Sequence, residues 1–179
     1  MRYSLICAPL TAAVIAGLSF AGNRIATADA ADGAIILTIA GKITKTNRGG
    51  FDPKRDAFLK YHDVKFSRAM SFDRAGLLKL PQTVVKAATG FYPDLSSYQG
   101  PRLAAVLKLV GAENYTSVKF LALDGYAVEL SREEIVGKDW IIALTRDGKG
   151  LALGGLGPLL ILHTPKASDG RVVKAEEEK

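Results

Sequence analysis

The sequence predicts a single α+β domain in which strands outnumber helices. Short β-branched or apolar runs end repeatedly at glycine, proline or Asp-Gly, which is the pattern of strands joined by tight turns. Leu103 to Val110 carries apolar residues at full helical spacing and is the clearest helix. We therefore expect a mainly β, α+β fold with one core.

The two ends of the chain are expected to lie outside this domain. Residues 1–30 have the pattern of a signal peptide, because Arg2 precedes an apolar stretch and Ala28 to Ala30 offers small residues at the spacing that signal peptidase reads. A permanent amino-terminal anchor is the alternative, although proline and glycine interrupt the stretch. We expect a periplasmic protein with its domain over 31–165 and a flexible, charged tail over 166–179.

Charge and cysteine content limit the chemistry of the exported chain. The formal charge is +6, and the expected cleavage removes Arg2, Arg24 and Asp29, a net +1, so that +5 remains. Such a chain suits an anionic ligand, an acidic partner or a membrane surface, or simply has a solvated basic face. Export argues against nucleic acid. Cleavage also removes Cys7, the single cysteine, and with it any disulfide or thiolate ligand.

The first half of the domain is predicted to alternate strands with short helices. Ala34 to Ile39 is a β-branched strand, and the polar segment Lys42 to Lys60 is a loop with one short helix over Lys54 to Tyr61. Asp73 to Leu80 predicts one or two helical turns capped by Asp73. Thr83 to Ala88 predicts the next strand.

An aromatic, turn-rich segment follows, Thr89 to Asp94, and is expected to be an irregular loop. Its rings are either a lid on the core or a stacking platform for a flat ligand, and the lid is the simpler interpretation. In the helix over Leu103 to Val110, Pro101 is placed for the first turn and Gly111 for the end. Arg102 in that first turn opposes the helix dipole, which suits an anionic or carbonyl partner.

A hairpin and a capped helix are predicted next. Ser117 to Leu123 and Tyr126 to Leu130 are strands separated by Asp124-Gly125, a preferred two-residue turn. The turn alone explains Asp124 without a ligand. Ser131 and Glu134 have the spacing of a capping box for a short helix.

The stretch from Trp140 to Pro165 is expected to hold both the core and the ligand site. Trp140 to Leu144 and Leu159 to Leu162 are apolar runs of strand length, and Asp147-Gly148 reverses the chain after the first. The glycine-rich loop around Gly155 to Gly157 either turns tightly or lets backbone amides meet a ligand. A tight connection without a ligand is the simpler of the two.

Catalytic and metal-binding patterns are weak in this sequence. His62 and His163 are the only histidines, and neither has a histidine or cysteine partner at metal-ligand spacing. The serines lack a nucleophile-elbow pattern. The sequence thus gives catalysis little support.

Four segments taken together carry a resemblance to a known family. They are FDRAGLLKLP at 72–81, YQGPRLAAVLKLVGA at 98–112, FLALDGYAVEL at 120–130 and GPLLIL at 157–162. In this order and spacing they resemble the molybdopterin-binding domain of sulfite-oxidase-like oxidoreductases, over nearly the whole mature chain. The resemblance implies the sulfite-oxidase-like fold.

One departure from the family pattern decides which relatives the chain is similar to. The enzymes hold molybdenum through a cysteine, and the region before Tyr98 has none, so the bond from thiolate to metal cannot form. The chain resembles instead the small exported members that bind a free pterin and regulate a membrane-bound cyclic-di-GMP enzyme through its periplasmic domain. The resemblance implies a non-catalytic, ligand-responsive regulator that takes a reduced pterin and no molybdenum.

The resemblance also implies where a pterin would bind. A pterin needs an aromatic face, together with a carboxylate or backbone groups for its aminopyrimidinone edge. Relatives often have a threonine and a tryptophan in the place of Thr89 to Tyr92, so a ring of this segment would supply the face, while either of two aspartates would pair with the edge. The implied ligand-binding residues are Thr89, Phe91, Tyr92, Arg102, Asp124, Tyr126, Asp147, Gly155 and Gly157.

Two other functions stay open at this stage. One is a ligand-independent interaction module in which the fold is only a docking surface, and it predicts partner capture that is indifferent to pterin. The other is an oxidoreductase subunit that holds a molybdenum cofactor by noncovalent contacts alone, and it predicts molybdenum in the native protein.

Overall fold

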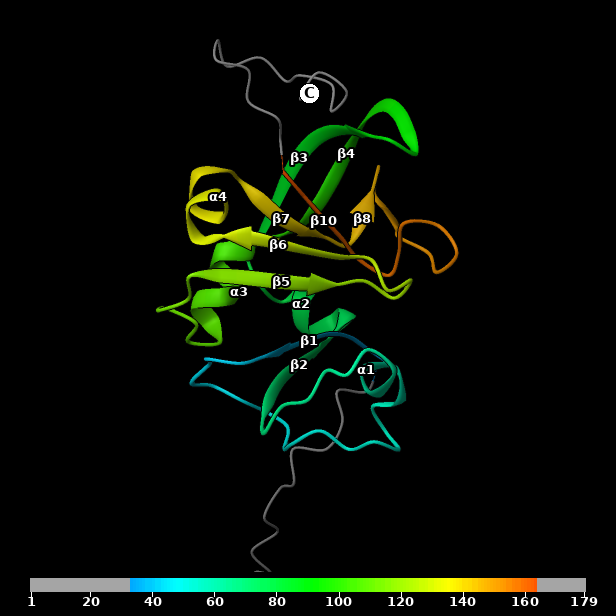
Figure 1. Ribbon diagram of the computed structural model, residues 1–179. Helices are drawn as coiled ribbons and strands as arrows, with labels where there is room; N and C mark the ends of the chain where they lie inside the picture. The colour runs from blue at the N-terminus through cyan, green and yellow to red at the C-terminus, as the bar shows by residue number, and fades with distance from the viewer. Residues whose placement is uncertain (1–32, 164–179) are drawn as a thin grey trace, which may run out of the picture.

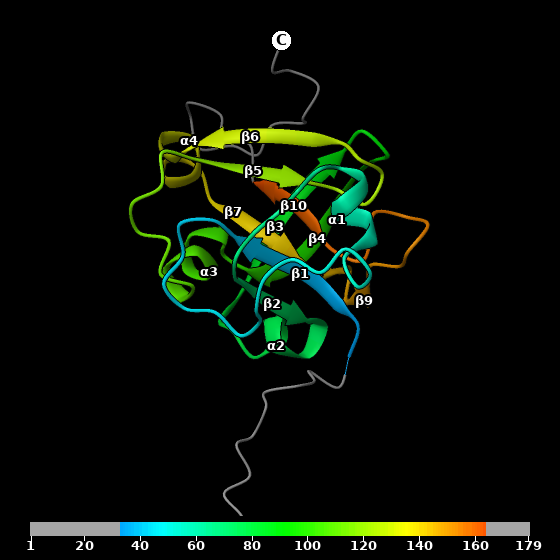
Figure 2. The same cartoon turned by 60° about the horizontal axis from the view of Figure 1, so that its bottom comes forward.

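A computed structural model describes residues 33–163 (Figures 1 and 2). The expected signal peptide and charged tail lie outside the described residues. Strands make up 40% and helices 18% of the described part, which confirms the mainly β, α+β prediction. The elements are β1 (Ile35–Ala40), α1 (Ala57–Tyr61), β2 (Ala69–Asp73), α2 (Arg74–Leu78), β3 (Gln82–Thr89), β4 (Tyr92–Pro101), α3 (Leu103–Leu109), β5 (Ser117–Leu121), β6 (Ala127–Ser131), α4 (Arg132–Gly137), β7 (Trp140–Ala143), β8 (Thr145–Arg146), β9 (Lys149–Gly150) and β10 (Leu160–His163).

The antiparallel pair β7 and β10 lies at the centre of the molecule, as predicted for these two apolar runs. Ile142 and Ile161 pack into one core cluster, whereas Ile141, Ala143 and Leu162 pack into a second cluster against β3 and β4. Both faces of the pair are therefore covered. A strand covered on both faces needs a continuous apolar run, which is what the sequence shows here.

Helix α3 fills the first cluster. Its stripe of Leu103, Val106, Leu107 and Val110 is buried against residues of β1, β2, β5 and β6, as the helical spacing predicts. Gly111 has a φ of +70° directly after the helix and ends it, also as predicted.

Helix α3 begins at Leu103 as predicted, but the predicted placement of Pro101 and Arg102 in its first turn is wrong. Pro101 is the last residue of β4, and Arg102 has an extended backbone at the N-cap, so neither belongs to the first turn. Proline fits the end of a strand as well as the start of a helix, because its fixed φ suits both.

The prediction of an irregular aromatic loop over Thr89 to Asp94 is wrong. Only Gly90 and Phe91 connect β3 to β4, which pair antiparallel along their length. Pro93 lies where the register shifts, so no ladder hydrogen bond is lost there. At Gly100, a Cβ would come within 1.8 Å of the Ile142 carbonyl oxygen, so glycine is what lets β4 run against β7.

Strand β2 was not predicted, because its inward-facing residues, Ala69, Ser71 and Asp73, are small or polar. The backbone of Ser71 donates to and accepts from the Asn47 side chain, both at 2.7 Å, and its hydroxyl lies 3.2 Å from that of Thr38. Hydrogen bonding thus compensates the burial of these groups. Asp73 also caps α2, as predicted.

The two predicted hairpin turns differ in outcome. Asp147 and Gly148 have φ of 48° and 76° between β8 and β9, which is the predicted two-residue turn. The predicted two-residue turn between β5 and β6 is wrong. The amide of Ala122 donates to the Tyr126 carbonyl, and the amide of Gly125 donates to the Ala122 carbonyl. The loop therefore has three residues, of which only Gly125 has a left-handed backbone. The capping box that opens α4 is confirmed.

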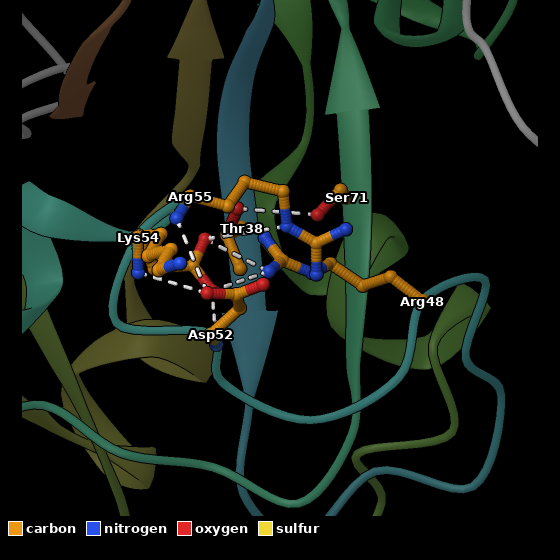
Figure 3. Close-up of polar contacts among 7 residues, drawn as sticks. Thr38, Arg48, Asp52, Lys54, Arg55 and Ser71 are labelled. Atoms are coloured by element: carbon orange, nitrogen blue, oxygen red, sulfur yellow. Dashed lines mark hydrogen bonds and ion pairs between the residues drawn. The ribbon is translucent and has the colours of Figure 1, made fainter.

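A buried ion pair joins two parts of the long connection between β1 and β2, which contains α1. Arg48 Nη2 donates to both oxygens of Asp56, at 2.8 and 2.6 Å, and the two side chains are 15% and 6% exposed. Figure 3 shows Asp52 and Lys54 in the surrounding network. Burial raises the pKa of Asp56, but the hydrogen bonds from Arg48 and from the Asp52 amide outweigh it and hold that pKa below 3.8, its ordinary value.

Candidate functional site

The start of β4 carries an aromatic ring covered by an arginine. The Arg146 guanidinium carbon of β8 lies 3.8 Å from the centroid of the Tyr92 ring. Arg146 Nε also donates to the hydroxyl of Ser96, which is 5% exposed, at 2.9 Å. Because one end of the guanidinium is tied to a buried group, the cation is held over the ring.

Asp147 is fixed beside this stack by its neighbour on β4. Its Oδ1 accepts from the Ser97 amide at 2.9 Å, and its own amide donates to the Ser97 carbonyl at 2.8 Å. Its Oδ2 lies 3.7 Å from Arg146 Nε, and the side chain is 55% exposed. One carboxylate oxygen is thus hydrogen-bonded to the backbone of Ser97, and the other lies beside the stack in a side chain that solvent reaches.

The glycine-rich loop comes close to the hydroxyl of Tyr92. A Cβ on Gly155 would lie 3.7 Å from the Tyr92 hydroxyl, so the loop surface is close to the ring. The amides of Gly155 and Gly157 both donate to the Ala152 carbonyl, at 3.1 and 3.0 Å. These amides are hydrogen-bonded within the loop, so the interpretation as a tight turn without a ligand explains them.

Thr89 and Phe91 belong to the tip of the β3–β4 hairpin. The Thr89 hydroxyl accepts from the Tyr92 amide at 3.1 Å and so stabilises the tip. Phe91 is 80% exposed. The hairpin therefore offers an open ring next to one that Arg146 already covers.

Asp124 and Tyr126 lie on the neighbouring β5–β6 turn. Asp124 Oδ1 accepts from the Tyr126 amide at 2.9 Å, and the Tyr126 side chain is 68% exposed. In both views, this turn lies beside the orange segment 151–158 that contains the glycine-rich loop (Figures 1 and 2). Both candidate aspartates are thus on the same side of the molecule as Tyr92.

Arg102 does not join this group. It follows β4 at the end opposite Tyr92, which ten strand residues place roughly 30 Å away along an extended chain. Its guanidinium forms an ion pair with Asp139.

Sequence reasoning missed two residues of the stack, Arg146 and Ser96. Arg146 lies opposite Tyr98 in the β4–β8 ladder, and this register alone brings it to the ring. The hydroxyl of Tyr98 itself is buried and has no hydrogen-bond partner within residues 33–163. The sequence shows that Arg146 lies next to the Asp-Gly turn. Its position over the Tyr92 ring could not be predicted, because β4 was not predicted.

A hollow of about 500 Å³ lies elsewhere, between the chain after β1 and the end of α3. Three lysines line it, and none of the residues predicted to bind a ligand does. It is lined by Lys42, Ile43, Thr44, Lys45, Lys108, Gly111, Glu113 and Asn114. The candidate site is therefore on the surface, outside this hollow. It is identified by the types and contacts of its residues and not by a pocket.

Two further observations concern residues 33–163. They contain no cluster of three or more His, Cys, Asp or Glu side chains that could hold a metal ion. No helix in this part of the chain is long and apolar enough to cross a membrane.

Comparison of the chain with protein-family models and with curated proteins finds no match in either set. The resemblance to the sulfite-oxidase-like family therefore stays a prediction.

Proposed function

We propose that the protein is a non-catalytic periplasmic regulator with a sulfite-oxidase-like fold that binds a reduced pterin at the Tyr92 stack. The observation that carries the proposal is the Arg146 guanidinium held 3.8 Å over the Tyr92 ring, with the Asp147 carboxylate fixed beside it. A flat, polar-edged ligand needs a planar surface next to an acceptor, and this arrangement supplies both.

The two open surfaces near the stack suit the two parts of a pterin. Phe91, which is 80% exposed, and the outer face of the Arg146 guanidinium can stack on the ring system. The aminopyrimidinone edge carries N–H donors, which a carboxylate oxygen accepts. We favour Asp147 over Asp124 for this role, because Asp147 is hydrogen-bonded beside the stack whereas Asp124 is on the next turn.

The proposal is for binding without redox catalysis. The enzymes of the resembling family tie molybdenum to the protein through a cysteine thiolate, and residues 33–163 contain no cysteine. The donor set therefore does not fit a thiolate-held molybdenum. The expected partner, the periplasmic domain of a membrane-bound cyclic-di-GMP enzyme, follows from the resemblance. Ligand on the exposed hairpin tip would change the surface that such a partner meets.

Calorimetric titration with tetrahydrobiopterin under anaerobic conditions tests this proposal. We expect saturable binding that Arg146→Met weakens roughly tenfold, the effect of losing about 1.4 kcal/mol of stacking and polar contact. The matched control is Arg132→Met, because Arg132 also covers a tyrosine, with its guanidinium carbon 5.1 Å from the Tyr115 ring. Equal affinities of the two variants would contradict the site, and no binding by the unaltered protein would contradict the function.

A further inference from the structure

Four large side chains protrude from turns on the same side of the molecule. We name Tyr61, Leu123, Tyr126 and Leu153 the loop-tip patch; their exposed fractions are 86%, 62%, 68% and 72%. They come from the end of α1, the β5–β6 turn and the glycine-rich loop. Apolar side chains at this exposure are unfavourable in water, so a group of them indicates a surface that is covered in some state.

The three segments that carry the patch are neighbours. A Cβ on Gly125 of the β5–β6 turn would lie 2.9 Å from the His62 ring, directly after α1. The same turn lies beside segment 151–158 in both views (Figures 1 and 2). The patch therefore extends over one continuous edge of the fold.

The charges around the patch are mainly positive. Segments 54–65, 119–129 and 146–153 carry seven Lys or Arg against five Asp or Glu, and Asp56, Asp124 and Asp147 among these acids accept hydrogen bonds within the protein. Lys60 and Lys149 are exposed and have no ion pair that the structure shows within residues 33–163. The whole chain has a charge of +6.

We propose that the loop-tip patch docks the protein onto an anionic phospholipid surface. Tyrosine and leucine at separate turn tips, with lysines beside them, suit the interface of a bilayer, where rings sit at headgroup level and basic groups meet anionic lipid. A protein partner would need one complementary surface, whereas acyl chains adapt around each tip. This docking does not depend on pterin binding.

Co-sedimentation with vesicles tests the proposal. The protein is mixed with vesicles of phosphatidylcholine and phosphatidylglycerol, and separately with vesicles of phosphatidylcholine alone. We expect partition to the anionic vesicles that falls as salt is raised, and a loss of at least roughly tenfold when Leu123→Asp and Leu153→Asp are combined, since two apolar tips would then be charged.

The matched control is Val136→Asp. Val136 is 67% exposed on α4, which lies on the opposite side of the molecule in both views. We expect this variant to partition like the unaltered protein, with unchanged thermal unfolding in all variants. No partition to anionic vesicles, equal partition to neutral ones, or an equal loss from Val136→Asp would each overturn the proposal.

Discussion

Asp56→Asn is the substitution for which the structure gives the clearest magnitude. It removes the charge that pairs with Arg48, whose side chain is 15% exposed, and leaves that guanidinium buried without a counterion. Arg48 Nε already has no hydrogen-bond partner within the described residues, so Asp56 carries most of the compensation. Removing one partner of a buried pair costs about 3–5 kcal/mol, and we expect about 3 kcal/mol because some water still reaches Arg48.

Urea unfolding followed by the fluorescence of Trp140 measures this effect. With a slope of about 2 kcal/mol per molar urea, the midpoint should fall by roughly 1.5 M. The matched control is Asp63→Asn, which breaks the ion pair between Asp63 and Lys65, whose side chains are 89% and 71% exposed. Asparagine tolerates the left-handed backbone of Asp63, at φ 53°, so a loss of only about 0–1 kcal/mol is expected.

A double-mutant cycle gives the refuting result. Arg48→Met combined with Asp56→Asn should be no less stable than Asp56→Asn alone, because the uncompensated charge is then gone. Two results would refute the reasoning. One is that Asp56→Asn and Asp63→Asn lower the free energy of unfolding equally; the other is that the losses from Asp56→Asn and Arg48→Met are additive. In either case the ion pair does not stabilise the connection between β1 and β2.

Three further predictions concern stability. The lowered pKa of Asp56 means that its contribution is complete well above 3.8 and is lost as the pH falls through its folded-state pKa, so the stability difference from Asp56→Asn should shrink between about pH 6 and about pH 3 in urea titrations. Gly100→Ala would place a Cβ 1.8 Å from the Ile142 carbonyl oxygen and should lower the free energy of unfolding by about 2 kcal/mol or more. Gly90→Ala, whose Cβ would have no atom within 4 Å, should lower it by under about 1 kcal/mol. Equal changes of the melting temperature in the two variants would contradict this. Ser131→Ala should cost about 1 kcal/mol by removing the N-cap of α4, and an unchanged melting temperature would show that the cap contributes nothing.

The elements that could be predicted from sequence are those in which apolar pattern and local hydrogen bonding agree. The stripe of α3 and the two runs of β7 and β10 were identified because their spacing matches the faces they bury. The Asp147-Gly148 turn and the capping box of α4 were identified because each is stabilised within a few residues.

The elements that were missed depend on distant partners. Strand β2 buries Ser71 and Asp73, and the hydrogen bonds that make this tolerable come partly from Asn47. Strand β4 contains turn-forming residues, and its glycine at position 100 serves close contact with β7. Both strands therefore lack a local signal.

The candidate site was predicted only in part, for the same reason. Tyr92, Asp147 and Gly155 were named, and the structure brings them together. Arg146 was missed because only the register of β8 on β4 places it over the ring. Arg102 was included because a cation in the first turn of a helix suits an anionic partner, but the length of β4 separates it from the aromatic segment.

The most direct test of the proposed function is to identify what the protein carries when it is purified from its native cells. Small molecules released from it are identified by mass spectrometry, and molybdenum is measured in the same sample. The account predicts a stoichiometric pterin without molybdenum, lost together with the Tyr92 ring in Tyr92→Ala. Absence of a pterin, with no saturable binding of tetrahydrobiopterin afterwards, would contradict it and favour the ligand-independent interaction module.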